Sequence, residues 1–416
     1  MSGANASPTG RSHQEMPDDP TKNNPGALSG VRVLALEVSV AGPHTTRILG
    51  DMGAEVIKIE KPGTGDLIRN WDTAVRGLSS GYVWLNGNKR SCAIDIKKKA
   101  GLDAVLRLAE RADVVLENFA PGVAERMGLG AEKLRARNPR LIYCSLSGYG
   151  QDGPYRDVKA YDLLIQGEAG IIATTGYPDK PAKVGLPIID LASSMYAAIA
   201  ILLALYQREK TGTGQFIDIA MFDSAVAWLG YFPHHYWHQG EEPARVGMRH
   251  HYITPYGPYL ASDAVYVSLA VATAEDWKIF CEKVIERPDL LEDSRFKTSE
   301  ARRKNRGVLE EIVEKIFSER PHQEWLSRLR ESRLPYGEVK GIGEVLAHPQ
   351  VIARRMIREM ESPVGQVPVV ASPLRLSDSP PRLDRIPALG QDTVAILREI
   401  GYSDGEIEQL RREQAI

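Results

Sequence analysis

The chain has 416 residues, of which 43% are hydrophobic and 25% are charged, and its net charge is −2. These values are ordinary for a soluble globular protein, and the length exceeds what one core usually holds, so we expect two domains. The charge gives no support for nucleic-acid binding, which normally needs a basic face. The cysteines Cys92, Cys144 and Cys281 are far apart, which favours a reducing compartment and buried core positions.

Residues 1–28 are polar and rich in Pro, Asn, Ser and Gly. They contain no apolar run, and their acidic residues argue against a transit peptide, so we expect a disordered leader. The one strongly apolar run, residues 195–205, is too short to cross a bilayer. We therefore expect a buried helix there, with an interface helix as the alternative, in a soluble protein with no membrane partner and a cytoplasmic location.

From Val31 onward, apolar runs typical of strands alternate with amphipathic stretches typical of helices. Expected strands cover residues 31–37, 54–60, 91–97, 112–119 and 140–146. Expected helices between them cover residues 44–53, 100–112 and 131–139. A long helix at about 190–210 and a strand at 215–220 follow. This alternation predicts a Rossmann-like large domain, residues 29–225, of α/β class with a mostly parallel sheet.

The texture changes after residue 225 to segments rich in aromatic residues and histidines. A strand at 264–271 and amphipathic helices from 277 to about 330 predict a smaller α+β domain, residues 226–345. The last segment, residues 346–416, contains an expected helix at 348–360, short strands near 367–373 and a final helix. We expect it to return and pack on the large domain.

The first strand, turn and helix imitate a dinucleotide-binding layout, with Glu60 ending the second strand. That fingerprint needs three glycines so that the backbone can approach a pyrophosphate. Here the turn has Gly42 alone, and Pro43 stands where a donor N–H is wanted. We therefore do not expect NAD binding.

Residues 173–185, ATTGYPDKPAKVG, place an aspartate between two prolines and behind small residues. By itself, Pro178-Asp179 predicts the two central positions of a type I turn, where Pro presets φ and Asp is tolerated. That structural role alone would explain the residue. The motifs of the rest of the chain add a second interpretation.

These motifs are SVAGPHTTRILGDMGAEVIKIEKPGTGD, NKRSCAIDIK, ADVVLENFAPGVAERMGLG, NPRLIYCSLSGYGQDGPY, TGYPDKPAKVG and REKTGTGQFIDIAMFDS. In content and order they resemble the family III CoA-transferases, a family that also contains α-methylacyl-CoA racemases. The resemblance covers about residues 29–416. It implies a large and a small domain in an interlocked homodimer. It also implies acyl-CoA and carboxylate substrates, with no permanently bound cofactor.

The resemblance implies that Asp179 is the nucleophile, because TTGYPDKP matches the T-G-x-x-D-G-P-P segment of the transferases. Lys180 replaces the glycine that follows in the family. CoA would then move from an acyl-CoA, with succinyl-CoA expected, through an aspartyl anhydride and an aspartyl-CoA thioester. Racemases instead carry a His before an Asp, where this chain has Tyr161, and pair it with an Asp that matches Asp190. A racemase and a non-catalytic CoA-binding protein remain the alternatives.

The same resemblance implies a set of CoA contacts, in which cations hold phosphates. These contacts are Ala41, Lys61, Ile94, Lys97, Asn118, Phe119 and Arg126. A solvated helix start is the alternative explanation for two of the three lysines at 97–99, and Arg126 has the alternative of a surface cation.

The acceptor is expected to be a hydroxydicarboxylate such as malate or citramalate. Formyl-CoA transferases carry Gln where this chain has Val40, and a polyglycine loop where it reads RHHYITPYGPY, which argues against oxalate. His44, Arg47, Arg69 and Tyr149 are candidates to face a second carboxylate, unless the arginines only pair with acids.

Three histidines, His234, His235 and His238, lie close together in sequence. No Cys or carboxylate cluster accompanies them, and the resembled family uses no metal. We therefore expect no metal site and aromatic packing instead.

Overall fold

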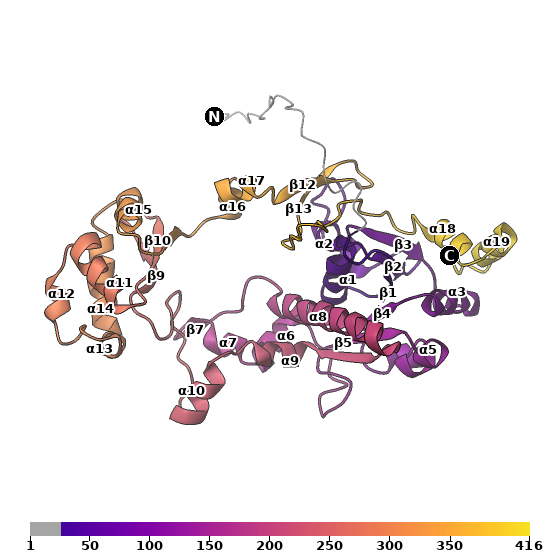
Figure 1. Cartoon of the computed structure of the whole chain (residues 1–416), viewed down its shortest axis with the longest axis horizontal. Coiled ribbons are helices and arrows are strands. Elements are labelled where there is room, and N and C mark those ends of the chain that lie inside the picture. Colours follow the sequence, from indigo (N-terminus) through magenta and orange to yellow (C-terminus); the bar gives the residue numbers. More distant parts are fainter. Residues whose placement is uncertain (1–25) are drawn as a thin grey trace, which may run out of the picture. The chain divides into compact units, whose positions relative to one another are not determined.

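The structure, a computed structural model, describes residues 26–416 (Figure 1). Unit 1 comprises the described residues up to Ser145 together with Ala197–Ile217 and Arg358–Ile416, and unit 2 comprises Leu146–Tyr196 and Asp218–Ile357. Each compact unit is built from separate stretches of chain. The predicted leader lies outside the described residues except for positions 26–28. The predicted domain boundaries at 225 and 345 stay predictions.

A six-stranded sheet lies at the centre of unit 1, in the order β3-β2-β1-β4-β5-β8. Its strands are β1 Arg32–Leu36, β2 Glu55–Glu60, β3 Lys89–Ala93, β4 Val114–Glu117, β5 Ile142–Ser147 and β8 Phe216–Ala220. The four pairs from β3 to β5 are parallel. The expected α/β class with a parallel sheet is confirmed. The strand order reverses between β1 and β4, the place where sheets of this order bind ligands.

The sequence of β1 shows why a parallel sheet forms. Four of its five residues are buried, and Val33 lies opposite Val56 of β2 and Val114 of β4. Strands covered on both faces read as continuous apolar runs, which made them visible in the sequence. The three cysteines are buried, as predicted.

Helices cover this sheet and extend to the C-terminus of the chain. They are α1 Ala41–Asp51, α2 Ser80–Leu85, α3 Lys99–Glu110, α4 Val123–Arg126, α5 Ala131–Arg137, α18 Thr393–Glu399 and α19 Asp404–Arg412, with a 3-10 turn at Leu67–Asn70. The α1 helix begins before the predicted residue 44 because Pro43 is tolerated in a first helical turn. Val105 of α3 shares a core with Ile396 and Ile407 of the last two helices. The C-terminal segment therefore completes the core of unit 1.

A buried ion network joins the carboxyl ends of β1 and β2 to the start of β3. Glu37 Oε1 lies 2.7 Å from Lys89 Nζ and 3.3 Å from Lys58 Nζ, and all three side chains are fully buried. Lys58 also lies 2.9 Å from Asp66, whose Oδ1 accepts the backbone N–H of Ser39 at 3.0 Å. Burial opposes the charge of Glu37, but the two ammonium groups outweigh it and lower its pKa. The network fixes the loop after β1 against the loop after β2.

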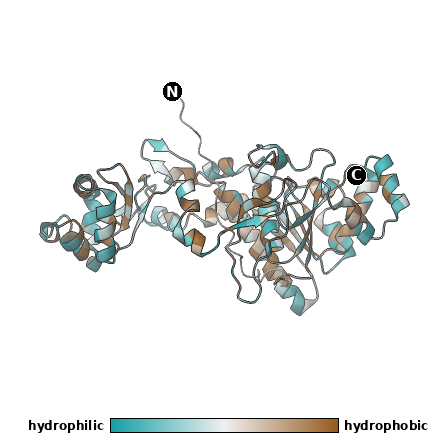
Figure 2. Ribbon diagram, turned by 90° about the horizontal axis from the view of Figure 1, so that it is seen from above, coloured by the Kyte–Doolittle hydropathy of each residue, from teal (hydrophilic) through white to brown (hydrophobic). Residues whose placement is uncertain are grey.

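Unit 2 contains short helices, a small hairpin and a three-stranded antiparallel sheet in the order β11-β10-β9. Its helices are α6 Asp162–Glu168, α7 Ile171–Thr174, α9 Met221–Ala227, α10 Phe232–Gln239, α11 Ala274–Ile279, α12 Asp289–Glu292, α13 Ser299–Lys304, α14 Arg306–Phe317, α15 His322–Glu331, α16 Ile342–Leu346 and α17 Pro349–Ala353, with a π-helical turn at Phe280–Val284. Its strands are β6 Gly176–Tyr177, β7 Lys180–Pro181, β9 Tyr256–Leu260, β10 Tyr266–Ala270 and β11 Tyr336–Glu338. Teal and brown residues alternate along the small-domain helices in Figure 2, as their amphipathic sequences predict.

The predicted helix at 348–360 is wrong in its second half. The α17 helix ends at Ala353, and Arg355 has a φ of 48°, a left-handed conformation that an L-residue helix cannot continue. The chain then forms β12 Ile357–Met360, which pairs with β13 Val367–Val370. Met360 is 1% exposed in a core cluster of unit 1, so tertiary burial overrides the helical spacing.

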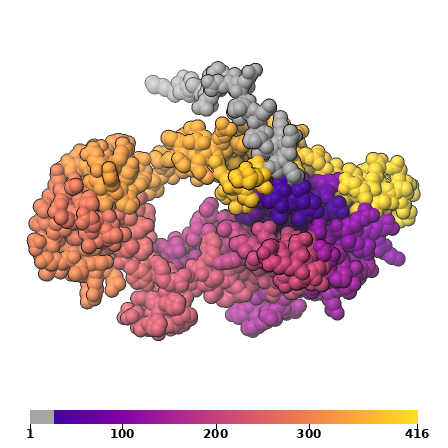
Figure 3. Space-filling model, viewed as in Figure 1, coloured from indigo at the N-terminus to yellow at the C-terminus, as the bar shows by residue number. Residues whose placement is uncertain are grey.

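The long helix α8 Ile188–Thr211 confirms the helix expected at about 190–210, but it extends well beyond the apolar run at 195–205. Among the described residues it alone is long and apolar enough to cross a membrane, so the length argument from residues 195–205 does not hold. One such helix is weak evidence, because core helices of soluble proteins pass the same test. The helix is not wholly buried either: Ile199, Leu203 and Tyr206 are 50%, 63% and 64% exposed. In Figure 3 its residues, coloured magenta, lie at the surface.

Glu37→Gln tests the buried network. We expect the free energy of unfolding to fall by about 3 kcal/mol, because removing one partner of a buried pair leaves buried charge uncompensated. Glu55→Gln is the matched control, since Glu55 forms partly exposed ion pairs with Arg32 and Arg90. Its cost should stay below about 1 kcal/mol. Urea unfolding measures both, and equal small losses would contradict the importance of the network.

Candidate functional site

Asp179 lies on the turn of a small hairpin in unit 2. In this hairpin β6 and β7 are antiparallel, with Gly176 opposite Pro181 and Tyr177 opposite Lys180. Residues 178 and 179 form the two-residue turn between them, so a turn at the predicted place is confirmed, while its type I geometry stays a prediction. Asp179 is exposed. The hairpin therefore presents a carboxylate at its tip.

Arg245 holds this hairpin through backbone carbonyls. Its guanidinium donates to Tyr177 O at 2.9 Å, to Pro178 O at 2.6 Å and to Ala173 O at 3.4 Å. Close by, Gly247 N donates to Gly176 O at 2.8 Å. The sequence did not indicate this role of Arg245, because a contact between residues 68 positions apart produces no local sequence pattern.

The other end of the same segment is tied to α6. Gln166 Oε1 accepts the Val184 N–H at 2.9 Å, and Gln166 Nε2 donates to Asp162 Oδ2 at 2.6 Å. Asp162 Oδ1 in turn accepts the Ile189 N–H at 2.7 Å, at the start of α8. These two polar side chains connect the segment after Asp179 with the following helix. Asp162 follows Tyr161 in the stretch matched to the racemase motif, whereas Gln166 was not singled out in the sequence.

Asp190 and Tyr161 are the positions that bear on a racemase. Burial, followed by the charge of Asp162, raises the pKa of Asp190 to about 7. Tyr161, in the place of the racemase histidine, is 70% exposed. Proton exchange α to a thioester needs tuned groups on both faces of the carbon. The raised pKa of Asp190 suits one such group, but Tyr161 places a phenol where the racemases carry the imidazole of a histidine.

The positions assigned to CoA lie in unit 1, just after the carboxyl ends of its strands. Ala41 follows β1, Lys61 follows β2, Ile94 and Lys97 follow β3, and Asn118, Phe119 and Arg126 follow β4. Parallel strands end at one edge of a sheet, so the fold brings these positions to the same edge. Their contact with CoA stays a prediction.

The side chains at this edge differ in what they offer. Lys61, Lys97 and Arg126 are exposed cations, which suits contact with phosphates. Ile94 is 1% exposed and belongs to the core of unit 1, and Phe119 packs partly buried against that core. Ile94 therefore has almost no exposed surface, and its backbone N–H already donates to Glu60 O at 2.9 Å.

Asn118 connects the chain after β4 with the loop after β1, where the strand order reverses. Its amide donates to Val38 O at 2.9 Å and accepts the Val38 N–H at 2.8 Å. A Cβ on Gly42 would lie 3.0 Å from the Asn118 and Glu37 side chains. Glycine therefore allows the first turn of α1 to approach β4 closely.

Two candidate acceptor residues are arginines that pair with acids. Arg69 donates twice to Glu60, through Nε and Nη2, each at 2.8 Å. Burial opposes the charge of Glu60, but these bonds outweigh it and lower its pKa to about 2. Arg47 pairs with Asp51 one helical turn away. Both arginines therefore pair with acids within the chain, and their contact with an acceptor stays a prediction.

The other acceptor candidates have mixed surroundings. Val40 is 3% exposed and belongs to a core cluster of unit 1. Burial, followed by neighbouring positive charges, lowers the pKa of His44 to about 4, so its ring is neutral near pH 7. In unit 2, the Tyr149 ring lies 5.7 Å from that of Phe222. Contact of these residues with an acceptor stays a prediction.

Two of the three clustered histidines lie beside aromatic rings. The ring centre of His234 lies 5.3 Å from that of Trp237, and that of His235 lies 5.9 Å from that of Tyr252. Aromatic packing was the predicted role of this segment. Within residues 26–416, no three His, Cys, Asp or Glu side chains are grouped so that they would hold a metal ion.

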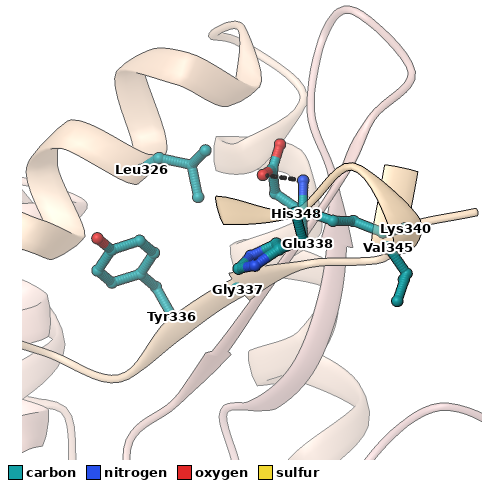
Figure 4. A pocket seen from close by; sticks show the side chains of 7 residues that line it. All are labelled: Leu326, Tyr336, Gly337, Glu338, Lys340, Val345 and His348. Atoms are coloured by element: carbon teal, nitrogen blue, oxygen red, sulfur yellow. Dashed lines mark hydrogen bonds and ion pairs between the residues drawn. The ribbon is translucent and has the colours of Figure 1, made fainter. Parts of the chain in front are cut away.

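Unit 2 also has a pocket beside β11, shown in Figure 4. It is lined by Leu326, Tyr336, Gly337, Glu338, Lys340, Val345 and His348. Lys340 Nζ pairs with Glu338 at 2.7 Å, so its charge is balanced within the pocket. None of the predicted site residues lines it.

Known proteins resemble this chain over almost its full length. Residues 28–393 match the model of CoA-transferase family III. The chain is 37% identical to succinyl-CoA:glutarate CoA-transferase of Homo sapiens over 97% of this chain and 91% of that protein. It is 33% identical to succinyl-CoA–D-citramalate CoA-transferase of Chloroflexus aurantiacus, over 94% of this chain and 98% of that protein. A crystal structure of a CAIB/BAIF family protein from Brucella suis superposes with a TM-score of 0.81 at 36% identity, covering 91% of this chain and 100% of that chain.

The family match agrees with the fold and with the motifs of the sequence. It includes the edge of the parallel sheet in unit 1 and the Asp179 hairpin in unit 2. Because the match spans most of the chain, it concerns the whole architecture rather than one shared motif. This chain belongs to CoA-transferase family III and is a CoA-transferase.

Proposed function

We propose that the enzyme moves CoA from succinyl-CoA to a dicarboxylic acid, with Asp179 as the nucleophile. The observation that carries this proposal is the exposed carboxylate on the turn between β6 and β7, in a chain of a CoA-transferase family. A carboxylate can form an anhydride with the donor acid and then a thioester with CoA. It can therefore pass CoA from one carboxylic acid to another without hydrolysis. The names of the human and Chloroflexus relatives support succinyl-CoA as the donor.

The first half of the reaction transfers CoA to the enzyme. An oxygen of Asp179 attacks the thioester carbonyl, the C–S bond breaks, and a mixed anhydride and CoA thiolate form. The thiolate then attacks the aspartyl carbonyl, which releases succinate and leaves an aspartyl-CoA thioester. The acceptor carboxylate repeats these two steps in reverse and restores Asp179. One thioester replaces another, so the overall exchange needs no ATP.

CoA must stay bound through all four steps, because free thiolate would end the cycle. We assign this task to the edge of the sheet in unit 1, where Lys61, Lys97 and Arg126 are exposed. Cations there suit the phosphates of CoA. Water must also be excluded, since it would hydrolyse the anhydride.

For the acceptor we propose a hydroxydicarboxylate such as malate or citramalate. The Chloroflexus relative is named for D-citramalate, whereas the human relative is named for glutarate, which lacks the hydroxyl. Since Arg47 and Arg69 pair with acids in the chain, the second carboxylate of the acceptor needs another partner or must displace one of these pairs.

Asp179→Ala tests the nucleophile. Turnover with succinyl-CoA should fall by at least about 1000-fold, because no other side chain can form the acyl intermediate. The melting temperature should not change, since Asp179 is an exposed turn residue. Asp289→Ala removes another exposed aspartate of unit 2, paired with Arg287, and should keep normal activity. Normal turnover of Asp179→Ala would contradict the proposal.

A panel of acceptors separates the proposed activity from its alternatives. With succinyl-CoA as donor, citramalate or malate should give a higher kcat/KM than glutarate. A preference for glutarate would contradict the acceptor but leave the transfer intact. In deuterated water without acceptor, a 2-methylacyl-CoA should gain no deuterium, because Tyr161 replaces the histidine. Deuterium uptake would favour a racemase, and CoA binding without transfer to any acid would favour a non-catalytic protein.

We also propose a homodimer in which a second subunit covers the exposed apolar face of α8. Ile199, Leu203 and Tyr206 are each at least half exposed. Contiguous apolar surface of this kind marks an interaction site. Mass photometry at low nanomolar concentration should find twice the chain mass. Leu203→Lys should reduce the dimer, while Val308→Lys, at a partly exposed position of α14, should not. An active wild-type monomer would contradict the dimer.

A further inference from the structure

We infer that Arg245 is a positioning residue that fixes the Asp179 turn for attack on the thioester. This inference rests on the proposed role of Asp179 and adds a residue to it. Arg245 lies in the segment between α10 and β9, far from the hairpin in sequence. Its role follows from the backbone carbonyls that its side chain contacts and from the small size of the hairpin.

The hairpin is too small to hold its own conformation. Each strand contributes two residues, and one of them, Pro181, has no N–H to donate to the pairing. Even longer isolated two-stranded hairpins are only marginally stable in water. A nucleophile on such a turn would sample many positions unless other parts of the chain restrain it.

Arg245 supplies that restraint at three points around the turn. It bonds Ala173 O at the end of α7, Tyr177 O in β6 and Pro178 O in the turn. The Pro178 carbonyl belongs to the peptide group that continues into Asp179, so this bond orients the backbone of the nucleophile itself. A planar guanidinium can serve three such acceptors, whereas a lysine ammonium acts as a point charge.

Gly247 extends the same restraint. Its N–H donates to Gly176 O at 2.8 Å, so the chain beside Arg245 lies against the β6 strand. Its φ is +62°, and a Cβ there would lie 2.5 Å from the Tyr177 ring. Any side chain at 247 would therefore push Tyr177, and the turn with it, out of place. The position of the hairpin thus depends on two residues of one segment, Arg245 and Gly247.

The test compares Arg245→Ala with Arg245→Lys. Because a misplacement of about 1 Å can cost about 100-fold in rate, we expect kcat to fall by about 100-fold in Arg245→Ala. KM for succinyl-CoA should change by no more than about twofold, since the residues assigned to CoA lie elsewhere. Arg245→Lys should not restore the rate. Guanidinium chloride should restore part of it in Arg245→Ala, while sodium chloride at equal ionic strength should not.

Two further variants make the outcome decisive. Arg295→Ala removes an exposed arginine of unit 2 that pairs with Asp293, and its kcat should not change. Gly247→Ala should lower kcat by displacing Tyr177, with the contacts of Arg245 left chemically intact. Normal kcat in Arg245→Ala, or full activity of Arg245→Lys, overturns the inference. A failure of the Arg245 inference leaves the proposed function standing if Asp179→Ala is inactive in the same assay. An active Asp179→Ala would instead overturn the proposed function.

Discussion

The Glu37 carboxylate, enclosed by Lys58 and Lys89, is the constraint on which the carboxyl edge of the sheet in unit 1 depends. Through Lys58 it holds Asp66, which binds the backbone of Ser39. Ser39 has a φ of 65°, a left-handed conformation that costs about 1–2 kcal/mol for an L-residue. The network therefore stabilises a strained loop just before α1, and that loop sets where the first helical turn lies.

The Asp179 hairpin is also held by residues distant in sequence, although through different interactions. In unit 1 the loops are held by buried charges. In unit 2 Arg245 donates hydrogen bonds to the exposed turn, and Gln166 accepts the N–H of Val184 in the segment that follows it. The turn conformation and the nucleophile are not competing explanations for Pro178-Asp179. A tight turn is how a short chain segment exposes one carboxylate while its backbone stays fixed.

The sequence predicted the features that depend on local pattern. The strands β1 to β5 were visible because parallel strands are buried on both faces, and the turn at 178–179 was visible from Pro and Asp chemistry. The predicted helix at 348–360 was wrong in its second half because β12 pairs with β13 and Met360 is buried in a core of unit 1, which no local pattern reveals. The contacts of Arg245 and the partners of Lys58 join distant segments and needed the fold. The residues assigned to CoA came from the family resemblance, and the parallel sheet places these residues along one edge.

The central claim is that Asp179 carries the CoA between donor and acceptor. Its most direct test is mass spectrometry of the enzyme quenched with succinyl-CoA in the absence of acceptor. The account predicts that the peptide containing Asp179 gains the mass of CoA less water, and that adding an acceptor acid removes this mass as acceptor-CoA forms. Turnover without any adduct on that peptide, or a competent adduct on another residue, would contradict the account.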